Sequence, residues 1–246
     1  MQQGKKVLLI DADAQANLTM ALGYNRPDDI PITLSTVMQN IIDDKTLDVS
    51  QGIIHHSEGG DLLPSNIEMS GFEVRLINAM SRERVLKTYV NEVKKNYDYV
   101  LIDCMPSLGM ITINALAAAD SVIIPTQPHY LSAKGLELLL RSVSMVKRQI
   151  NPKLRIDGIL MTMVMPRTNI SKEITATVKS AYGKKIKVFD TEIPHSIRAA
   201  EATAEGKSIF AYDKSGKVAA AYEQLGKEVA EIGEKQRNQN RADRIR

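Results

Sequence analysis

The sequence contains no tryptophan, only three phenylalanines and a single cysteine among its 246 residues. A hydrophobic core must therefore be built from leucine, isoleucine, valine, methionine and alanine. Because one cysteine cannot form an intramolecular disulfide, Cys104 excludes the disulfide-rich secreted class and fits a reducing cytosol. With 43% hydrophobic and 25% charged residues, the composition is that of an ordinary globular protein. The length allows one large α/β domain or two small ones.

Long apolar stretches are missing as well. No run approaches the roughly 20 residues that a transmembrane helix requires. The N-terminal apolar stretch is too short for a secretory signal peptide. We therefore expect a cytoplasmic protein with no membrane contact.

The net charge of +3 is concentrated at the C-terminus. From residue 235 onward, five cations face one anion, so this stretch carries +4 and the rest of the chain sums to −1. Because residues 235–246 are also poor in apolar side chains, we expect a disordered basic tail that follows a single folded domain over residues 1–234. A nonspecific contact with nucleic acid or another polyanion is the alternative.

Short apolar runs alternate with helix-like segments along the chain. Most runs are continuous and β-branched, which is typical of strands buried on both faces of a parallel sheet. The alternation predicts βαβ units and an α/β fold, with a doubly wound, mostly parallel sheet flanked by helices. Residues 24–50 are expected to form a loop-rich excursion with one short helix. The expected strands are 7–11, 52–55, 61–65, 99–103, 121–125, 158–164 and 188–193, and the expected helices are 81–96, 108–119, 131–150, 171–181, 196–205 and 216–234.

Polar residues follow the expected strands, and ligands of such sheets bind beyond the carboxyl ends of the strands. Asp11 and Asp13 follow the first run, and Asp103 ends YDYVLID, which has the form of a Walker B strand. Asp103 would hold a water bound to Mg²⁺, since hard cations take oxygen ligands. Asp13 could orient or polarise an attacking water. The alternative is that Asp11 and Asp13 only cap the turn and helix that follow.

Four segments, in this order, resemble the ParA/Soj branch of the ParA/MinD partition ATPases. They are VLLIDADAQANLT, YDYVLIDCMPSLGMITINALAAADSVIIPTQ, PRTN and IPHSIRAAEATAEGKSI. The resemblance implies a deviant Walker A, P-loop NTPase-like fold and a homodimer that forms around ATP and Mg²⁺. It further implies that the ATP-bound dimer binds DNA nonspecifically on the nucleoid, and that a ParB-like centromere-binding partner stimulates hydrolysis.

The resemblance also implies roles for individual residues. Asp13 matches the switch I aspartate that positions the hydrolytic water, and Asp103 matches the Walker B aspartate, with switch II running to Gly109. We assign Asp11 to the cofactor site as well. Two positions depart from the family pattern, Met105 in place of a proline and His195 in place of a frequent arginine. The residues implied to border the adenine are Thr162, Met163 and Pro194, and those implied to contact DNA are Arg167 and Arg198.

The two arginines follow different strands at the same expected edge of the sheet. A dimer would present each of them twice, which suits contacts to DNA phosphates rather than base reading. For Arg198 the alternative is an exposed ion pair with Glu201, three residues further along a helix.

A phosphate-binding loop is the most informative absence, because no G-x-x-x-x-G-K-S/T motif occurs in the sequence. The tripeptide at 206–208 is Gly-Lys-Ser, but Glu201 stands five positions before Gly206, and the segment follows a helix rather than a strand. The family places its loop one strand-loop-helix unit before VLLID. We therefore expect the first strand and the P-loop of the family fold to be absent. In the family fold, that strand is expected to lie in the sheet between the strand that leads to Asp13 and the strand that carries Asp103.

Three explanations for this absence stay open. The native protein could begin roughly 20–30 residues earlier, the span of one strand, one loop and one helix, with Gly4 as the C-cap of the preceding helix. The chain could be a genuine short form that binds no ATP. Another chain could supply the strand.

Rival functions fit the sequence less well. A MinD-like membrane helix needs bulky apolar residues near the C-terminus, but only Ile245 follows Ile232. No G-x-G-x-x-G follows a strand, which argues against a dinucleotide-binding enzyme. The adjacent pair His55 and His56 would point to opposite faces of a strand, which argues against a metal hydrolase. Two classes remain: a nucleotide hydrolase that switches DNA binding, and a non-catalytic DNA- or protein-interaction module of the same descent.

Overall fold

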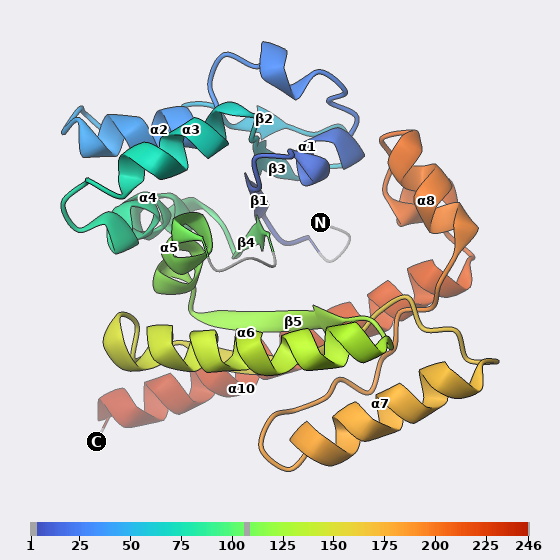
Figure 1. The fold of residues 1–246 in the computed structure, drawn as a ribbon. Coiled ribbons are helices and arrows are strands. Elements are labelled where there is room, and N and C mark those ends of the chain that lie inside the picture. The colour runs from blue at the N-terminus through green and yellow to red at the C-terminus, as the bar shows by residue number, and fades with distance from the viewer. Residues whose placement is uncertain (1–3, 106–108, 246) are drawn as a thin grey trace. The chain divides into compact units, whose positions relative to one another are not determined.

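The structure is a computed structural model that describes residues 4–105 and 109–245, apart from the side chains of residues 133, 237 and 239–245. The strands are β1 (Val7–Ala12), β2 (Ile54–His55), β3 (Asp61–Leu63), β4 (Tyr99–Cys104), β5 (Ser121–Thr126) and β6 (Arg155–Met161) (Figure 1). The α-helices are α1 (Asn17–Ala21), α2 (Leu34–Ile42), α3 (Glu68–Leu76), α4 (Val85–Val93), α5 (Met110–Ala118), α6 (Tyr130–Gln149), α7 (Asn169–Tyr182), α8 (Ile197–Ala204), α9 (Ile209–Tyr212) and α10 (Lys217–Ile245). The 3₁₀ helices are η1 (Pro27–Asp29), η2 (Arg82–Arg84) and η3 (Lys94–Asn96).

The chain divides into two compact units by its internal contacts. The single domain expected over residues 1–234 stays a prediction. Unit 1 comprises Met1–Asp120, Leu139–Leu154 and Thr203–Ser208. Unit 2 comprises Ser121–Leu138, Arg155–Ala202 and Ile209–Arg246.

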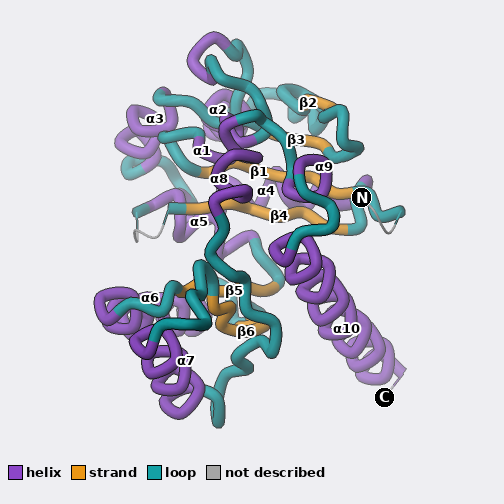
Figure 2. The backbone as a smooth tube through the Cα atoms, turned by 90° about the vertical axis from the view of Figure 1, so that its right-hand side faces the viewer, coloured by secondary structure: helices purple, strands orange, loops and turns teal. Residues whose placement is uncertain are grey.

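Unit 1 contains a four-stranded sheet in the order β2-β3-β1-β4. The strands β3, β1 and β4 are parallel and lie side by side (Figure 2), and the short β2 is antiparallel to β3. Helices α2, α3, α4 and α5 pack on one another beside this sheet (Figure 1). The largest fully buried side chains of the unit are Leu8, Ile10, Leu34, Met38, Leu62, Leu63, Met69, Phe72, Leu76, Leu86 and Tyr89. Burial of each such side chain contributes about 1.5–3 kcal/mol, and the core lacks tryptophan, as the composition predicts.

The position expected for an absent strand is wrong. β1 and β4 pair directly over their whole length, from Val7 opposite Tyr99 to Ala12 opposite Cys104. No strand separates the strand that leads to Asp13 from the strand that carries Asp103 in this part of the structure. The two apolar runs satisfy each other's backbone hydrogen bonds, so they need no strand between them.

Unit 2 contains the parallel pair β5-β6, with a register shift between Val122 and Ile123. The run at 188–193, expected as a strand, forms only isolated bridges, Val188 to Ile159 and, just beyond it, Pro194 to Val164. The reason lies in α10. Glu228 accepts the backbone N–H groups of residues 190 and 191, which a ladder would otherwise use, and so the strand is interrupted.

The last helix is longer than expected. The prediction ended it at residue 234 and placed a disordered tail after it, whereas α10 continues to Ile245. Lysine, glutamate, glutamine, arginine and alanine dominate its last turns, and these residues have high helix propensity even without an apolar face. In the described part of the chain, no helix combines the length and apolarity needed to cross a membrane.

Candidate functional site

β1 and β4 bring aspartates to one edge of the unit 1 sheet. The strands pair in register, with Asp11 opposite Asp103. Asp13 follows the end of β1 by one residue. The carboxyl ends of neighbouring parallel strands share an edge, which is where open α/β sheets bind ligands. We call Asp11, Asp13 and Asp103 the carboxylate edge.

Asp11 is fully buried, and its carboxylate accepts hydrogen bonds from the loop that follows it. Oδ2 accepts the backbone N–H of Thr19 at 2.8 Å and the Thr19 hydroxyl at 2.7 Å, and Oδ1 accepts the N–H of Asp13 at 3.2 Å. Burial raises the pKa of Asp11, and the bonds from Thr19 partly offset this. The capping alternative therefore describes the contacts of Asp11, and its side chain is closed to a ligand in this structure.

Asp13 is half-buried in the tight turn between β1 and α1. Its Oδ1 accepts the N–H of Gln15 at 2.9 Å, and its Oδ2 accepts the side-chain amide of Asn17 at 3.5 Å. Ala16 closes the turn by donating its N–H to the Asp13 carbonyl, and it has a φ of 52°. This left-handed conformation is uncommon for a residue with a side chain, and such strain clusters at functional sites.

Asp103 is exposed at the end of β4, so it is the member of the carboxylate edge that a ligand can reach most easily. Desolvation by the surrounding chain raises the pKa of Asp103, and the charges of Asp11 and Asp13 raise it further. Burial and the same three carboxylates raise the pKa of Cys104 to about 12, so its thiol stays protonated and is a poor nucleophile. The edge carries an excess of negative charge that a cation would relieve.

The raised pKa of Asp103 predicts that Asp103→Asn stabilises the protein at neutral pH. The folded state disfavours the charged form of Asp103, and this lowers the free energy of unfolding. The destabilisation is fully present above the raised pKa and disappears as the pH falls toward the ordinary pKa of 3.8. The side chain is exposed, so we expect a gain of only about 0.5–1 kcal/mol in the free energy of unfolding at pH 7. Urea unfolding of both proteins from neutral to acidic pH measures this gain in stability. A gain that increased as the pH fell would contradict the raised pKa of Asp103.

The carboxylate edge has a donor set that fits magnesium, the metal implied by the family resemblance. Mg²⁺ takes oxygen ligands and keeps several waters, so an exposed carboxylate such as Asp103 can hold it through water. Within residues 4–105 and 109–245, no three His, Cys, Asp or Glu side chains converge as an all-protein metal site does. The arrangement suits a metal whose remaining ligands are water and a bound nucleotide.

The segment expected to form switch II is described only at its ends, because residues 106–108 lie outside the described residues. Gly109 is the N-cap of α5 and has extended backbone. The carboxylate of Glu73, on α3, fills the space that a Cβ at Gly109 would occupy. It also accepts the N–H of Ile111 at 3.2 Å. A negative charge at a helix N-terminus is favourable, so Glu73 anchors the start of α5.

Unit 2 gathers the three residues expected to border an adenine. The N–H of Thr162 donates to the Thr126 carbonyl at 2.9 Å, which places it just beyond the ends of β5 and β6. Met163 is exposed and has a φ of 55°, a second strained position. Val164 bridges to Pro194, so the two segments lie side by side. Their contact with a nucleotide stays a prediction.

The two arginines expected to contact DNA are both exposed, and both follow these bridged segments in unit 2. Arg167 lies in the turn before α7. Arg198, in the first turn of α8, pairs with Asp213 at 3.6 Å, while its own side chain is 63% exposed. The alternative partner, Glu201, instead accepts the hydroxyl of Tyr212 at 3.0 Å. An exposed ion pair of this kind contributes little to stability and leaves Arg198 available to a phosphate.

Gly206-Lys207-Ser208 is unsuited to phosphate binding, in agreement with the sequence. The Ser208 N–H donates to the Glu58 carboxylate at 2.9 Å, and Lys207 pairs with Glu205 at 2.8 Å. Gly206 has a φ of 65° and lies against Gly23, where a Cβ would clash with backbone. Carboxylates of the protein therefore occupy the donors that a phosphate would need.

Thr19 and Glu73, whose hydrogen bonds hold the loops of the site in place, were not identified from the sequence. Thr19 links Asp11 to the loop after β3, since its hydroxyl also accepts the N–H of Ser65 at 3.2 Å. Glu73 lies on α3, a helix that was not predicted. The apolar spacing of Met69, Phe72 and Leu76 is a helical signal that could have revealed α3 and hence Glu73.

The sequence matches the model of an AAA domain family over residues 1–156. The chain is 41% identical over 231 residues to the sporulation initiation inhibitor protein Soj of Bacillus subtilis, covering 94% of this chain and 88% of that protein. It is 36% identical over 227 residues to the chromosome partitioning protein ParA of Myxococcus xanthus, covering 92% of this chain and 77% of that protein.

Among solved structures, cobyrinic acid a,c-diamide synthase from Mycobacterium smegmatis, with bound ATP analog and magnesium, is similar with a TM-score of 0.78 and 33% identity. The match covers 91% of this chain and 81% of that chain, and it shows an α/β, P-loop NTPase-like fold. The family model matches from residue 1 and a strand is present at Val7–Ala12, so the expected loss of the first strand is not supported. By sequence and by fold, the chain belongs to the ParA/Soj family of partition ATPases.

Proposed function

We propose that this protein is a nucleotide-switched DNA partition protein. It binds DNA nonspecifically as an ATP-bound homodimer and leaves the DNA after hydrolysis, which a ParB-like partner stimulates. The observation that carries the proposal is the in-register alignment of Asp11 with Asp103, which puts the carboxylates of two strands at one edge. The similarity to Soj and ParA supports the biological setting.

The three aspartates of the carboxylate edge have different roles. Asp103 holds a water of the Mg²⁺ shell, because it is the exposed carboxylate of the edge. Asp13 orients and polarises the attacking water. Asp11 is a positioning residue, since its contacts fix the backbone of Asp13 and the first turn of α1. Bound Mg²⁺ would neutralise charge on the phosphates. Thr162, Met163 and Pro194 border the adenine.

A second candidate function follows from one sequence observation. Residues 1–246 contain no G-x-x-x-x-G-K-S/T motif, and a phosphate-binding loop supplies the backbone N–H groups and the lysine that hold phosphates. A chain that lacks these phosphate-binding groups would act as a non-catalytic DNA- or protein-interaction module. Nucleotide dependence separates this module from the switch.

Arg167→Ala and Arg198→Ala are each expected to weaken DNA binding about equally on unrelated duplexes. Each substitution removes the neutralisation of one phosphate without touching a base edge, so the slope of log K against log salt should become shallower by about 1 in each variant. Lys184→Ala, another exposed cation of unit 2, is the control. Fluorescence anisotropy on two duplexes of different sequence at several salt concentrations measures both slopes. An unchanged slope in both arginine variants would remove them from the DNA surface.

Retention on immobilised duplex DNA tests the function itself. The protein is applied to the DNA under three conditions: with Mg²⁺ and ATP, with ADP, or without nucleotide. We expect retention only with Mg-ATP, and prolonged retention for Asp13→Ala, which binds but does not hydrolyse. Equal retention without nucleotide would exclude the switch and favour the non-catalytic module.

A further inference from the structure

A buried carboxylate of unit 2 has no part in the hydrolysis proposed above. Glu228 lies on α10 and is only 8% exposed. Its Oε1 accepts the backbone N–H of Thr191 at 3.0 Å and the Thr191 hydroxyl, and its Oε2 accepts the N–H of Asp190 at 3.3 Å. Bonds from a backbone to a charged acceptor are strong, so they fix the chain at this point. We call residues 187–194 the clamped segment.

Glu228 carries its negative charge at neutral pH. Burial opposes that charge, but the hydrogen bonds from Thr191, Lys187 and Asp190 together lower the pKa of Glu228 below its ordinary value of 4.5. The ammonium of Lys187 lies 3.3 Å from Oε2 and 5.0 Å from the centre of the Phe189 ring. The carboxylate therefore binds a cation of the clamped segment as well as its backbone.

Apolar packing holds the clamped segment from the side of the sheet. Phe189 is fully buried and belongs to one core cluster with Leu160 of β6 and Val218 of α10. A Cβ at Gly158, on β6, would lie 2.7 Å from the Phe189 ring, so glycine lets the ring approach the strand closely. The segment is thus fixed both by this packing and by Glu228.

The clamped segment ends at the residues expected to border an adenine. The N–H of Ile193 donates to the Met161 carbonyl at 2.9 Å, and the Ile193 carbonyl accepts the N–H of Val164 at 3.0 Å. These bonds set Pro194 beside Val164, next to the left-handed turn at Met163. A shift of the segment along β6 would therefore move Pro194 relative to Met163.

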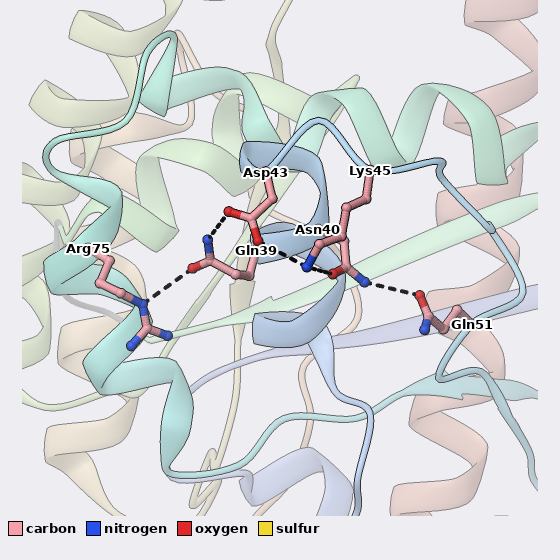
Figure 3. A network of polar contacts seen from close by, with 6 residues as sticks. All are labelled: Gln39, Asn40, Asp43, Lys45, Gln51 and Arg75. Atoms are coloured by element: carbon pink, nitrogen blue, oxygen red, sulfur yellow. Dashed lines mark hydrogen bonds and ion pairs between the residues drawn. The ribbon is translucent and has the colours of Figure 1, made fainter.

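Side-chain bonds replace the regular pairing that the clamped segment lacks. The segment makes only isolated bridges to its neighbours, so its backbone pairing specifies its position weakly. Glu228 adds two bonds to its backbone. A surface network in unit 1 is different, because it joins side chains only to one another (Figure 3), namely those of Gln39, Asn40, Asp43, Lys45, Gln51 and Arg75. Exposed contacts of that kind contribute little to the position of a backbone.

We propose that Glu228 is a positioning residue that sets the base-binding edge of the nucleotide site and, through it, the preference for adenine. This role rests on the proposed function. The N–H and carbonyl of Met163 are not hydrogen-bonded within the described residues, so the edge offers a donor and an acceptor beside Pro194. Adenine presents the acceptor N1 beside its amino donor, whereas guanine presents the donor N1–H beside the acceptor O6. A donor and an acceptor held in place by Glu228 distinguish the two bases.

Nucleotide selectivity tests this positioning role. Calorimetric titration with Mg-ATP and with Mg-GTP gives the ratio of the two affinities, which partial unfolding does not change. We expect the wild type to bind ATP about tenfold more tightly than GTP, and Glu228→Ala to lose most of this preference. Glu228→Gln can still accept both bonds from Thr191 and should retain part of it. The glutamine variant also keeps the test decisive if the alanine variant does not fold.

Amide hydrogen exchange tests the clamp without any nucleotide. In Glu228→Ala, we expect the amides of residues 190–195 to exchange about tenfold faster, because their segment loses its acceptor. Glu223→Ala is the matched control, since it removes an exposed carboxylate of α10 that pairs with Lys227 at 3.0 Å. Asp43→Ala removes a carboxylate from the network of Figure 3. Both controls should keep the exchange and the selectivity of the wild type.

Four results would overturn the role of Glu228 alone. They are a wild type that binds ATP and GTP equally, wild-type selectivity in Glu228→Ala, an equal weakening of both nucleotides in that variant, and unchanged exchange at residues 190–195. A wild type that binds neither nucleotide would refute the proposed function, and the role of Glu228 would fall with it. The two failures are therefore distinguished by the wild type itself.

Discussion

Replacing Asp11 with alanine is expected to lower the free energy of unfolding by about 2–4 kcal/mol. The substitution leaves three donors without their acceptor, namely the N–H and hydroxyl of Thr19 and the N–H of Asp13. Each buried unsatisfied donor costs about 1–3 kcal/mol. Relief of a buried charge, which the raised pKa of Asp11 reflects, offsets part of this loss. Urea unfolding at neutral pH measures the difference.

Asp11→Asn is the matched control for this prediction. Its side-chain oxygen can still accept both bonds from Thr19, but its amide would meet the Asp13 N–H as a second donor. We therefore expect an intermediate loss, about 1–2 kcal/mol. An alanine variant as stable as the wild type would mean that Asp11 does not hold the turn and is free for another role.

In contrast to Asp11→Ala, Asp13→Ala is expected to cause a large loss of ATP hydrolysis and a small loss of stability. A positioned base contributes about 10²–10⁴-fold to a rate, so ATP hydrolysis should fall by that factor. The bonds that Asp13 accepts from Gln15 and Asn17 lie in an exposed turn, and their loss should cost about 1 kcal/mol or less. Phosphate release in the presence of DNA measures the rate.

Asp13→Asn separates water activation from turn geometry. The amide oxygen can keep the bond from Gln15 and so preserve the turn, but an amide is not a base. Its rate should match that of Asp13→Ala. Hydrolysis at the wild-type rate in either variant would transfer the proposed role to another residue.

The sheet of unit 1 could be predicted in part from sequence, because its longer strands are continuous, β-branched apolar runs. VLLIDA and YVLIDC are strands as expected, and both deliver an aspartate to the same edge. Their direct pairing could not be predicted. Any two buried parallel strands have similar apolar runs, and no local signal says which one neighbours which.

The different burial of Asp11 and Asp13 could not be predicted from the sequence either. The two residues are identical in type and two positions apart, yet one is buried and the other half-exposed. Thr19, eight residues away, donates to Asp11 across a turn in which Ala16 has a left-handed backbone conformation. No alternation of apolar and polar residues encodes that turn.

The expected strand at 188–193 failed for a similar reason. Its composition favours a strand, but Glu228 lies 37 residues further along the chain from Thr191 and accepts its backbone N–H and hydroxyl. A contact at that separation overrides local propensity. α3 differs, because its apolar period was present in the sequence and was overlooked.

A nucleotide–Mg²⁺ site at the carboxylate edge is the feature on which the proposed function depends most directly. Calorimetric titration with ATP tests this site in the wild-type protein and in Asp103→Asn. Each protein is titrated once in the presence of Mg²⁺ and once in the presence of EDTA. We predict that Mg²⁺ tightens ATP binding to the wild type by about tenfold or more, the effect of roughly 1.4 kcal/mol, and that Asp103→Asn loses this tightening. An absence of ATP binding, or equal Mg²⁺ dependence in both proteins, would contradict the proposed site.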